Sequence, residues 1–392
     1  MSLSSSFIIP GQTIGIIGGG QLGRMMALSA KEAGFKVIVL EPSKQSPAGQ
    51  VADEEIVASY HDRNALSELA RKSDVITYEF ENIDYQSLKW LSEKAYIPQG
   101  AELIKITQDR ILEKQALTEA GVNVAPYLVI RERKDLEQGI QTIGYPAVLK
   151  TARGGYDGKG QFVIKTKEEI EKAAELLEHG PCVLEALVPF EKEISVVITK
   201  GVTNELTCFP IGENLHIQNI LHKTIAPARI SGEIEEKVHQ MAKQIADHLD
   251  LVGTLAVELF LTDKQDIFVN ELAPRPHNSG HYTIEACNIS QFGQHIRAIC
   301  GWPLQKIQLL CPAIMINILG QHVQPLIEEI PKRSSWSVHL YGKEEAKLNR
   351  KMGHITVLTD NIKETSQELK STNIWSEADE RETLLQTSGK MI

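Results

Sequence analysis

Paired cysteines are missing from this chain of 392 residues. Its five cysteines form no CxxC motif, and the first of them is Cys182. An odd number of cysteines without close pairs argues against a disulfide framework and against a structural zinc site. We therefore expect a chain that folds without either kind of cross-link.

Long hydrophobic runs are missing too. No apolar stretch approaches the roughly 20 residues that a membrane-spanning helix needs. The start, MSLSSSFIIPGQ, has neither the basic segment nor the long apolar core of a signal peptide. These absences predict a cytoplasmic protein with no membrane partner.

Positive charge is in short supply. The chain has 41 lysines and arginines against 51 aspartates and glutamates, which gives a formal net charge of −10. A protein with this charge repels nucleic acid and anionic lipid surfaces, so we expect no nucleic-acid partner. The hydrophobic share of 42% is ordinary for a globular protein, and the length exceeds what one core usually organises. We therefore expect several domains.

The hydrophobic pattern changes along the chain. The first hundred residues alternate apolar runs with amphipathic helices, a βαβ rhythm that predicts a parallel sheet. Later strands follow one another with short turns, which is typical of antiparallel sheets. The overall class is thus a combination of α/β and α+β. We place the boundaries at 1–107, 108–190, 191–320 and 321–392.

A glycine motif lies near the start of the chain. Gly18, Gly20 and Gly23 in GIIGGGQLGRM form GxGxxG between a predicted strand and a predicted helix, and Glu41 ends the next strand. This pattern is the fingerprint of dinucleotide binding and suggests an NAD-dependent dehydrogenase. Small residues at such a turn suit any polar ligand, however, and they also allow close packing of helix on strand. The motif therefore predicts a geometry rather than a cofactor.

Two glutamates face each other in a predicted hairpin. In GTLAVELFLTDKQDIFVNELAPRPHNSG, a turn centred between Lys264 and Gln265 places Glu258 opposite Glu271, with Cβ atoms roughly 4.5 to 5.5 Å apart. Opposed carboxylates destabilise a sheet unless a cation lies between them, and a hard divalent cation prefers oxygen ligands. The alternative is a pair of solvated glutamates, which the apolar flanking residues make less favourable. Because Mg²⁺ usually combines one or two carboxylates with substrate phosphates, the hairpin predicts a nucleotide nearby.

A second glycine-rich loop supplies candidate phosphate donors. The loop RGGYDGKG follows Lys150 and contains Lys159, and its glycines allow the backbone to close over an anion. It is not a GxxxxGK[ST] loop, and glycine-rich hairpin loops are often only flexible turns. Further on, the backbone near Leu187 and Val188 is a candidate contact for an adenine edge, and Glu193 is a candidate acceptor for ribose hydroxyls. Taken alone, Glu185 and Glu193 are more typical of ordinary surface charges.

These motifs occur in the order found in the ATP-grasp superfamily. Within it, GIIGGGQLGRM, YEFENI, ARGGYDGKGQ, NELAPRPHNSGH and YGKEEAKLNRKMGH closely resemble the N5-carboxyaminoimidazole ribonucleotide synthetase family over nearly the whole chain. The resemblance implies an ATP-grasp fold. Region 1–107 would be a Rossmann-like pre-ATP-grasp domain, 108–190 would include a small lid, 191–320 would carry the metal site, and 321–392 would be a small C-terminal domain.

The resemblance also implies a nucleotide site and a metal site. The metal ligands would be Glu258 and Glu271, holding Mg²⁺, with Mn²⁺ as the alternative. The residues implied for ATP are Arg110, Lys150, Gly155, Tyr156, Asp157, Gly158, Lys159, Gly160, Gln161, Glu185, Ala186, Leu187, Val188, Glu193, His216, Asn270 and Glu271. Some family members have arginine in place of Lys159, and that exchange loses a bidentate contact.

Further residues are implied for the acceptor and for catalysis. The acceptor would be held by Gln21, Leu22, Glu81, Tyr156, Lys343 and Arg350, the last two as clamps for a 5′-phosphate. The implied catalytic residues are Lys150, Tyr156, Asp157, Lys159, Arg275, His277, Asn278 and Ser279. Asp157 and His277 both remain candidates for the proton acceptor. The plainer interpretations are a solvated basic loop around Lys343 and a polar loop anchored by Pro274 and Pro276.

The implied reaction is ATP-dependent carboxylation of 5-aminoimidazole ribonucleotide with bicarbonate through carboxyphosphate, in purine biosynthesis. The family also implies a homodimer and transfer of the product to a separate N5-carboxyaminoimidazole ribonucleotide mutase. Alternatives within the superfamily are a formate-using glycinamide ribonucleotide transformylase and a biotin carboxylase-like enzyme. Outside it they are a dehydrogenase and a nucleotide-binding regulatory subunit without turnover.

Overall fold

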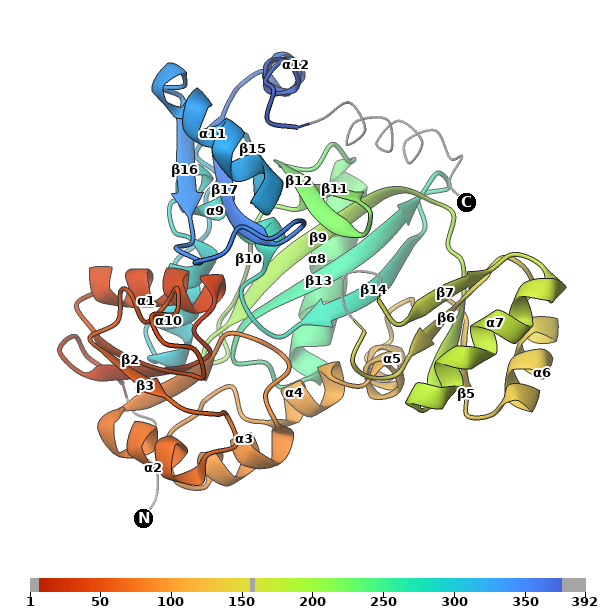
Figure 1. Cartoon of the computed structure of the whole chain (residues 1–392), viewed down its shortest axis with the longest axis horizontal. Helices are drawn as coiled ribbons and strands as arrows, with labels where there is room; N and C mark the ends of the chain where they lie inside the picture. The colour runs from red at the N-terminus through yellow and green to blue at the C-terminus, as the bar shows by residue number, and fades with distance from the viewer. Residues whose placement is uncertain (1–6, 156–158, 376–392) are drawn as a thin grey trace.

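A computed structural model describes residues 7–155 and 159–375. Its strands form three sheets. Figure 1 shows the N-terminal domain at the lower left, the lid at the lower right, and the central sheet above and between them. No helix in the described ranges is long and apolar enough to cross a membrane.

The N-terminal domain is a parallel sheet covered by helices. Its strand order is β3-β2-β1-β4, and every pairing is parallel, as the βαβ pattern predicts. Strands β1, β2 and β4 are mostly buried because helices cover both faces, which explains their apolar runs, whereas the edge strand β3 is mostly exposed. The elements are β1 (Thr13–Ile17), α1 (Gln21–Glu32), β2 (Lys36–Glu41), β3 (Glu54–Val57), α2 (Arg63–Lys72), β4 (Val75–Tyr78), α3 (Tyr85–Ser92) and α4 (Glu102–Thr107).

The lid is a small antiparallel sheet of order β5-β8-β6-β7. Helices α6 and α7 pack on it and enclose a core of their own. The helix α5 (Arg110–Glu119) leads into this unit, which contains β5 (Tyr127–Ile130), α6 (Arg133–Ile143), β6 (Ala147–Thr151), β7 (Gln161–Ile164), α7 (Ile170–Ala174) and β8 (Cys182–Ala186). After β7 the chain forms 3₁₀ turns on either side of α7.

The central sheet carries most of the predicted site. In the described part of the chain it has nine strands in the order β14-β13-β9-β11-β12-β15-β17-β16, with β10 beside β9. The strands are β9 (Phe190–Lys200), β10 (Leu206–Cys208), β11 (Gly212–Ile217), β12 (Ile220–Ala226), β13 (Gly253–Thr262), β14 (Ile267–Ala273), β15 (Ala313–Leu319), β16 (Trp336–Leu340) and β17 (Lys351–Leu358). Its helices are α8 (Gly232–His248), α9 (Thr283–Ala286), α10 (Gln291–Ile299), α11 (Val323–Glu329) and α12 (Ile362–Lys370).

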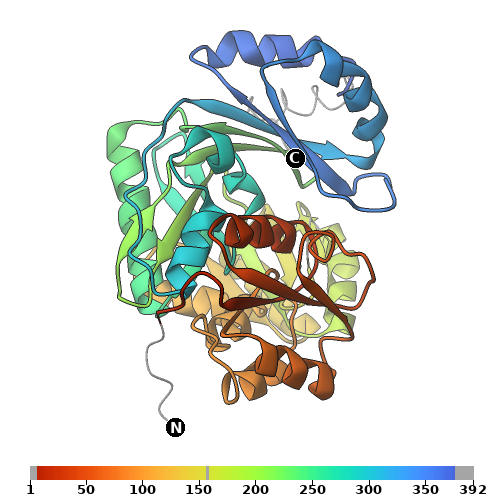
Figure 2. The same cartoon turned by 90° about the vertical axis from the view of Figure 1, so that its left-hand side faces the viewer.

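The C-terminal region extends this sheet rather than forming a separate one. Strands β16 and β17 lie beyond residue 320, yet β17 pairs with β15 and so continues the sheet across that boundary. Figure 2 places this blue region above the red N-terminal domain. The loop after β16 reaches α1 and its neighbourhood, where Gln50 Nε2 donates to Gly342 O at 2.7 Å. This hydrogen bond joins two segments that lie 292 positions apart in the chain.

Candidate active site

The glycine turn before α1 binds carboxylates of its own chain. The N–H groups of Gly20 and Gly23 both donate to the buried Glu79, the second at 2.6 Å, and Gly19 N–H donates to Glu41 Oε2 at 2.8 Å. A Cβ on Gly18 would lie 2.3 Å from Glu79 Cγ, so the glycine permits this close approach. The anion site that a dinucleotide pyrophosphate would use is therefore filled by protein. This relationship removes the basis of the dehydrogenase interpretation.

Glu79 itself was not among the predicted residues. Burial raises the pKa of its carboxyl group, while the N–H groups of Gly23 and Gly20 act in the opposite direction. The signal in the sequence was an acid at the end of β4, in YEFE, two residues before the predicted Glu81. No local sequence pattern indicated that the Glu79 side chain would accept hydrogen bonds at the start of α1.

The hairpin of β13 and β14 has the predicted register. Glu258 pairs directly with Glu271, and the register then shifts, so that Asn270 is an extra residue in β14. The consecutive residues Asn270 and Glu271 are both partly exposed. This breaks the alternation of buried and exposed residues along the strand and indicates a bulge. The bulge places an amide and a carboxylate together opposite Glu258.

The two glutamates are not equivalent. The side chain of Glu258 is 17% exposed and that of Glu271 is 43% exposed. Burial, and then the charge of Glu271, raise the pKa of Glu258 to about 8. A cation between the carboxylates would offset both effects. The pair is therefore suited to a hard divalent ion.

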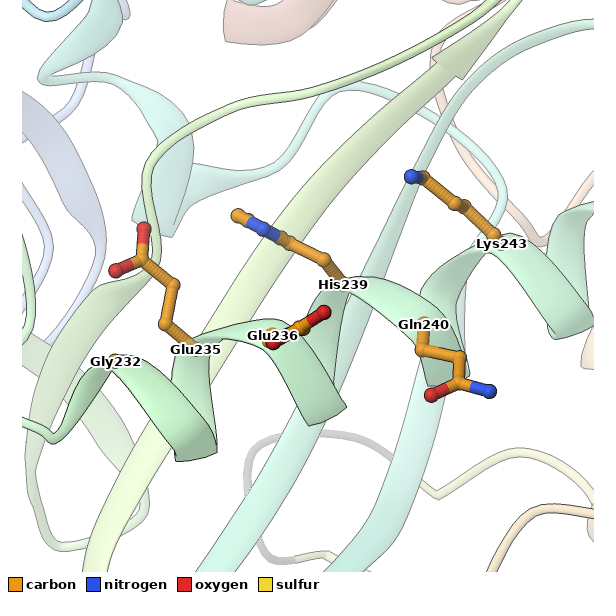
Figure 3. A pocket seen from close by; sticks show the side chains of 6 residues that line it. All are labelled: Gly232, Glu235, Glu236, His239, Gln240 and Lys243. Atoms are coloured by element: carbon orange, nitrogen blue, oxygen red, sulfur yellow. The ribbon is translucent and has the colours of Figure 1, made fainter.

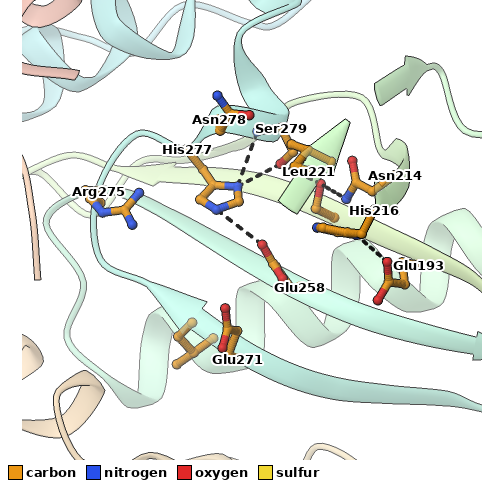
Figure 4. Close-up of polar contacts among 12 residues, drawn as sticks. Glu193, Asn214, His216, Leu221, Glu258, Glu271, Arg275, His277, Asn278 and Ser279 are labelled. Carbon is orange, nitrogen blue, oxygen red and sulfur yellow. Dashed lines mark hydrogen bonds and ion pairs between the residues drawn. The ribbon is translucent and has the colours of Figure 1, made fainter. Parts of the chain in front are cut away.

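His277 lies against the buried member of this pair (Figure 4). Its Nε2 is 3.2 Å from Glu258 Oε1, while its Nδ1 accepts the Ser279 N–H at 3.3 Å. Burial, followed by the charges of Arg275 and Lys351, holds the pKa of His277 well below its usual value. The neutral ring therefore carries its proton on Nε2 and directs it at Glu258.

A buried hydrogen-bond chain extends from His277 into the sheet. Ser195 Oγ donates to Ser279 Oγ at 2.7 Å, and Ser279 Oγ lies 2.9 Å from His277 Nδ1. Asn214 Nδ2 donates to Ser195 Oγ, and Thr224 Oγ1 donates to Asn214 Oδ1, both at 2.9 Å. Ser195, Asn214 and Thr224 were not predicted. Their polar side chains within buried strand runs were the available signal.

Arg275 and Glu81 are brought together although 194 residues separate them. The guanidinium donates to both carboxylate oxygens, at 3.0 Å for Oε1, and both side chains are largely buried. Burial alone would raise the pKa of Glu81, but the charge of Arg275 lowers it below its usual value. Glu81 thus meets Arg275, one of the predicted catalytic residues, and its carboxylate is engaged by the protein.

On the lid side, Lys150 belongs to a buried group of charges. Its Nζ donates to Glu185 Oε2 at 3.1 Å, and Lys114 Nζ lies 3.5 Å from Glu185 Oε1. Burial is the first cause that lowers the pKa of Lys150. Lys114 is fully buried and was missed, although it lies four residues after Arg110 on α5. Arg110 in turn donates to Glu271 Oε2 at 3.4 Å, which connects this group to the hairpin.

The predicted ribose residue Glu193 lies against His216. Glu193 Oε2 and His216 Nδ1 form a short hydrogen bond. Burial alone would lower the pKa of His216, but the carboxylate of Glu193 raises it. The two residues face one another from the neighbouring strands β9 and β11.

The basic C-terminal loop approaches the start of α1. Lys343 Nζ donates to Gln21 Oε1 at 2.6 Å and to Lys351 O at 2.7 Å. Burial, and then Arg350, lower the pKa of Lys343 to about 8. The exposed Arg350 donates to Glu345 O at 3.2 Å. The charge of Lys351, a neighbour of Arg350 that was not predicted as a site residue, influences the pKa values of Glu81, His216, Glu258 and His277.

Several other predicted residues are engaged by packing or by hydrogen bonds within the protein. Leu22 is buried in the N-terminal core. The amides of Asn278 and Asn317 are paired with each other and fully enclosed. The N–H of Leu187 donates to Pro146 O at 3.3 Å, and that of Ala186 to Pro126 O at 2.9 Å. Sequence reasoning did not anticipate these partners.

The base of the glycine-rich loop is closed by glycine. Thr151 N–H donates to Gly160 O at 2.8 Å, and Gly160 has a φ of +72°. A Cβ on Gly155 would lie 2.9 Å from Lys159 O. Gln161 begins β7 opposite Lys150. The predicted residues Tyr156, Asp157 and Gly158 lie outside the described residues.

A shallow hollow on the outer face of α8 is separate from this site. Glu235, His239 and Lys243 project from the helix there, as Figure 3 shows. None of the predicted site residues lines it. Several of the predicted site residues lie on or beside β13 and β14 instead.

Comparisons with known proteins match three consecutive parts of the chain. Residues 11–108 match the ribonucleotide synthetase preATP-grasp domain, 115–292 the ATP-grasp domain, and 313–368 the phosphoribosylaminoimidazole carboxylase C-terminal domain. The N5-carboxyaminoimidazole ribonucleotide synthase of Bacillus subtilis (strain 168) is 54% identical over 378 residues, which cover 96% of this chain and 99% of that protein.

Solved structures agree with these matches. A crystal structure of an ADP complex of an N5-carboxyaminoimidazole ribonucleotide synthetase is 53% identical, with a TM-score of 0.93 and coverage of 96% and 100% of the two chains. The Aspergillus clavatus N5-carboxyaminoimidazole synthase in complex with ADP and 5-aminoimidazole ribonucleotide is 32% identical, with a TM-score of 0.87 and coverage of 95% and 99%.

Proposed function

This chain belongs to the family of N5-carboxyaminoimidazole ribonucleotide synthases, and from that premise we propose which of its residues carry each part of the reaction. The enzyme is an ATP-dependent ligase of purine biosynthesis. It carboxylates 5-aminoimidazole ribonucleotide with bicarbonate and forms ADP and phosphate. The observation that carries the residue assignment is the Glu258–Glu271 pair, which has Arg110 on one side and His277 on the other.

The pair fits magnesium. Glu258 is only 17% exposed and has a raised pKa, and the bulge adds the Asn270 side chain beside Glu271. The described ranges hold no cluster of three or more His, Cys, Asp or Glu side chains arranged to take a metal ion. Magnesium does not require one, because it combines one or two carboxylates with substrate phosphates and water. When bound, it would neutralise charge on the phosphates during transfer.

Lys150 and Arg110 would stabilise phosphoryl transfer from the lid side. Bicarbonate attacks the γ-phosphorus, the bond to ADP breaks, and carboxyphosphate forms. Cationic side chains held in place before reaction lower the barrier because they need no reorganisation. Glu185 and Lys114 fix Lys150 in this position.

Arg275 and His277 would hold the bicarbonate and its phosphorylated product. Both side chains are largely buried, which limits hydrolysis of the intermediate by water. Because both nitrogens of the neutral His277 ring are engaged, we propose that it donates a hydrogen bond rather than accepts the amine proton. Lys159, Tyr156, Asp157, Asn278 and Ser279 remain proposed participants, and Asp157 is then the preferred proton acceptor.

The acceptor would lie between α1 and the C-terminal loop. Lys343 and Arg350 would bind its 5′-phosphate, and the contact of Lys343 with Gln21 places the clamp at the start of α1. Glu81 would contribute to the ribose site through its pairing with Arg275. Charge-assisted contacts of this kind supply both affinity and orientation.

The nucleotide would lie between the lid and the central sheet. Glu193 and His216 would face the ribose, and residues 185–188 the adenine. The proposed contacts of the loop are Gly155, Gly158, Gly160 and Gln161. Asn270 would contact the phosphates.

We extend the proposal to a cytoplasmic homodimer that passes its product to a separate mutase. These properties are expected from the family. Sedimentation of the purified protein, cell fractionation and coupled assays with the mutase would test them separately.

The function is tested by phosphate release from Mg-ATP with bicarbonate. Stimulation by 5-aminoimidazole ribonucleotide is expected. Stimulation only by glycinamide ribonucleotide with formate would indicate the related transformylase reaction instead. Absence of turnover with either acceptor would contradict an active ligase.

A further inference from the structure

A glutamine side chain binds the main chain of His277 on both sides. Gln291, the first residue of α10, is fully buried. Its Oε1 accepts the His277 N–H at 2.8 Å, and its Nε2 donates to His277 O at 2.7 Å. One amide therefore satisfies both backbone groups of His277, as a neighbouring β-strand would.

The surrounding loop holds this amide in place. A Cβ on Gly280 would lie 2.5 Å from Gln291 Oε1, so glycine leaves the space that the side chain needs. Thr283 Oγ1 accepts the Gln291 N–H at 3.0 Å and donates to Gly280 O at 2.6 Å. The glutamine is thus fixed at its main chain and at its amide, and it has little freedom to release His277.

The position of the His277 main chain decides where its ring points. The ring places Nε2 at 3.2 Å from Glu258, and Ser279 holds the opposite nitrogen. The helix that carries Gln291 also packs on α1, with Phe292 and Met26 in the same core cluster. The amide therefore connects the rigid core of the N-terminal domain to the ring beside Glu258.

From this geometry we propose that Gln291 is a positioning residue of the carboxylation reaction. It holds His277 so that phosphorylated bicarbonate is delivered to the amine before water reaches it. This inference rests on the proposed role of His277. Gln291 touches no reacting atom and acts only through the histidine.

The test is Gln291→Met, which keeps the length of the side chain and removes both hydrogen bonds. A misplaced catalytic group costs about 10- to 100-fold in rate, so kcat for product should fall by about that factor while the KM for ATP stays unchanged. The ADP formed per product should rise above the wild-type ratio because intermediate is lost to water. Gln291→Glu retains an acceptor for the His277 N–H and should give an intermediate ratio.

Gln294→Met provides a matched control. Gln294 is also fully buried on α10, but its Nε2 donates to Thr207 Oγ1 at 3.0 Å and to Gln305 O at 2.8 Å. Its variant should keep the wild-type ratio of ADP to product. Thermal unfolding and ADP affinity, measured for every variant, separate loss of folding from loss of positioning.

The His277→Asn variant separates the positioning role of Gln291 from the proposed role of His277. A Gln291→Met enzyme that matches Gln294→Met in kcat and in product ratio, while His277→Asn is impaired, would overturn the positioning role alone. A His277→Asn enzyme with wild-type kcat and ratio would overturn the proposed role of His277. If Gln291→Met does not fold, the ratio in Gln291→Glu decides, and a wild-type value there contradicts the inference.

Discussion

Glu258 and Glu271 face each other across the hairpin of β13 and β14, directly before the register shifts at Asn270. The first is mostly covered and lies beside His277, and the second meets Arg110 from α5. The pair would therefore join the proposed bicarbonate site to the proposed nucleotide site. Loss of either charge should affect phosphoryl transfer more than folding.

Glu271→Gln removes one charge and keeps the size of the side chain. We expect kcat to fall by about 10²- to 10³-fold, the range found when one electrostatic contributor to a transition state is lost. The melting temperature should change little because the residue is 43% exposed. Steady-state kinetics with thermal unfolding check both statements, and full activity would contradict the metal assignment.

Metal binding should depend on pH through Glu258. Burial and Glu271 raise the pKa of its carboxyl group to about 8. A metal needs the deprotonated form, so affinity should rise as the pH increases toward 8, by up to about tenfold per unit, and then level off. Calorimetric titration of Mn²⁺ from pH 6 to 9 measures this directly.

The same titration carries its own control. Below pH 8, each bound ion should release a proton, and buffers of different ionisation enthalpy reveal that release. Glu258→Gln should remove both the tight binding and the proton release. An affinity that stays constant between pH 6 and pH 9 would contradict the role given to Glu258.

The register of this hairpin was predictable because it depends only on residue count. The bulge was not, because it depends on contacts between distant parts of the chain. Glu113 Oε1 accepts the Leu272 N–H at 2.8 Å, and Lys114 Nζ donates to Asn270 O at 3.2 Å. Both residues belong to α5, so the outer edge of β14 obtains partners that no local pattern in the hairpin indicates.

Lys114 should be important for stability. It is fully buried beside Glu185, and removal of one partner from a buried ion pair costs about 3 to 5 kcal/mol. We expect Lys114→Met to lower the free energy of unfolding by about this amount, reduced in part by the remaining contact of Glu185 with Lys150. Chemical denaturation measures the change.

The exposed Lys105, which pairs with Glu102 at 3.4 Å, is the matched control for Lys114. Its replacement by methionine should have little effect, because surface ion pairs contribute little. Equal destabilisation by the two variants would show that burial of Lys114 is not the cause.

His295 should make the fold sensitive to acid. Its Nδ1 accepts the Thr254 N–H at 3.1 Å, and its Nε2 lies 2.9 Å from Thr77 Oγ1, so it joins β13 to the N-terminal domain. Burial lowers the pKa of His295 to about 3. Between pH 3 and 6.5 the unfolded chain binds a proton that the folded chain does not, so stability is lost as the pH falls below 6.5.

The slope contributed by His295 is about 1.4 kcal/mol per pH unit. His295→Gln should show a shallower loss of stability between pH 6.5 and 4.5 than the wild type, in denaturation experiments at several pH values. His61→Gln, at a mostly exposed position, should keep the wild-type slope. A wild-type slope in His295→Gln would contradict this account.

The organisation of the chain was predictable for a physical reason. Continuous apolar strands between amphipathic helices require a covered parallel sheet, and the N-terminal domain has one. The contacts within the candidate site were harder to predict, because many of them join residues that are far apart in the sequence. The contact of Glu79 with Gly23 spans 56 positions, and that of Arg275 with Glu81 spans 194. Motifs predicted which residues form the site, whereas the fold determined their partners.

The central claim is that this chain activates bicarbonate by phosphorylation before carboxylating 5-aminoimidazole ribonucleotide. Turnover with ¹⁸O-labelled bicarbonate, followed by mass spectrometry of the released phosphate, tests it most directly. The account predicts labelled phosphate, because the bicarbonate oxygen that attacks phosphorus remains with it when the carboxyl group is transferred. Unlabelled phosphate, formed together with the carboxylated product, would contradict it.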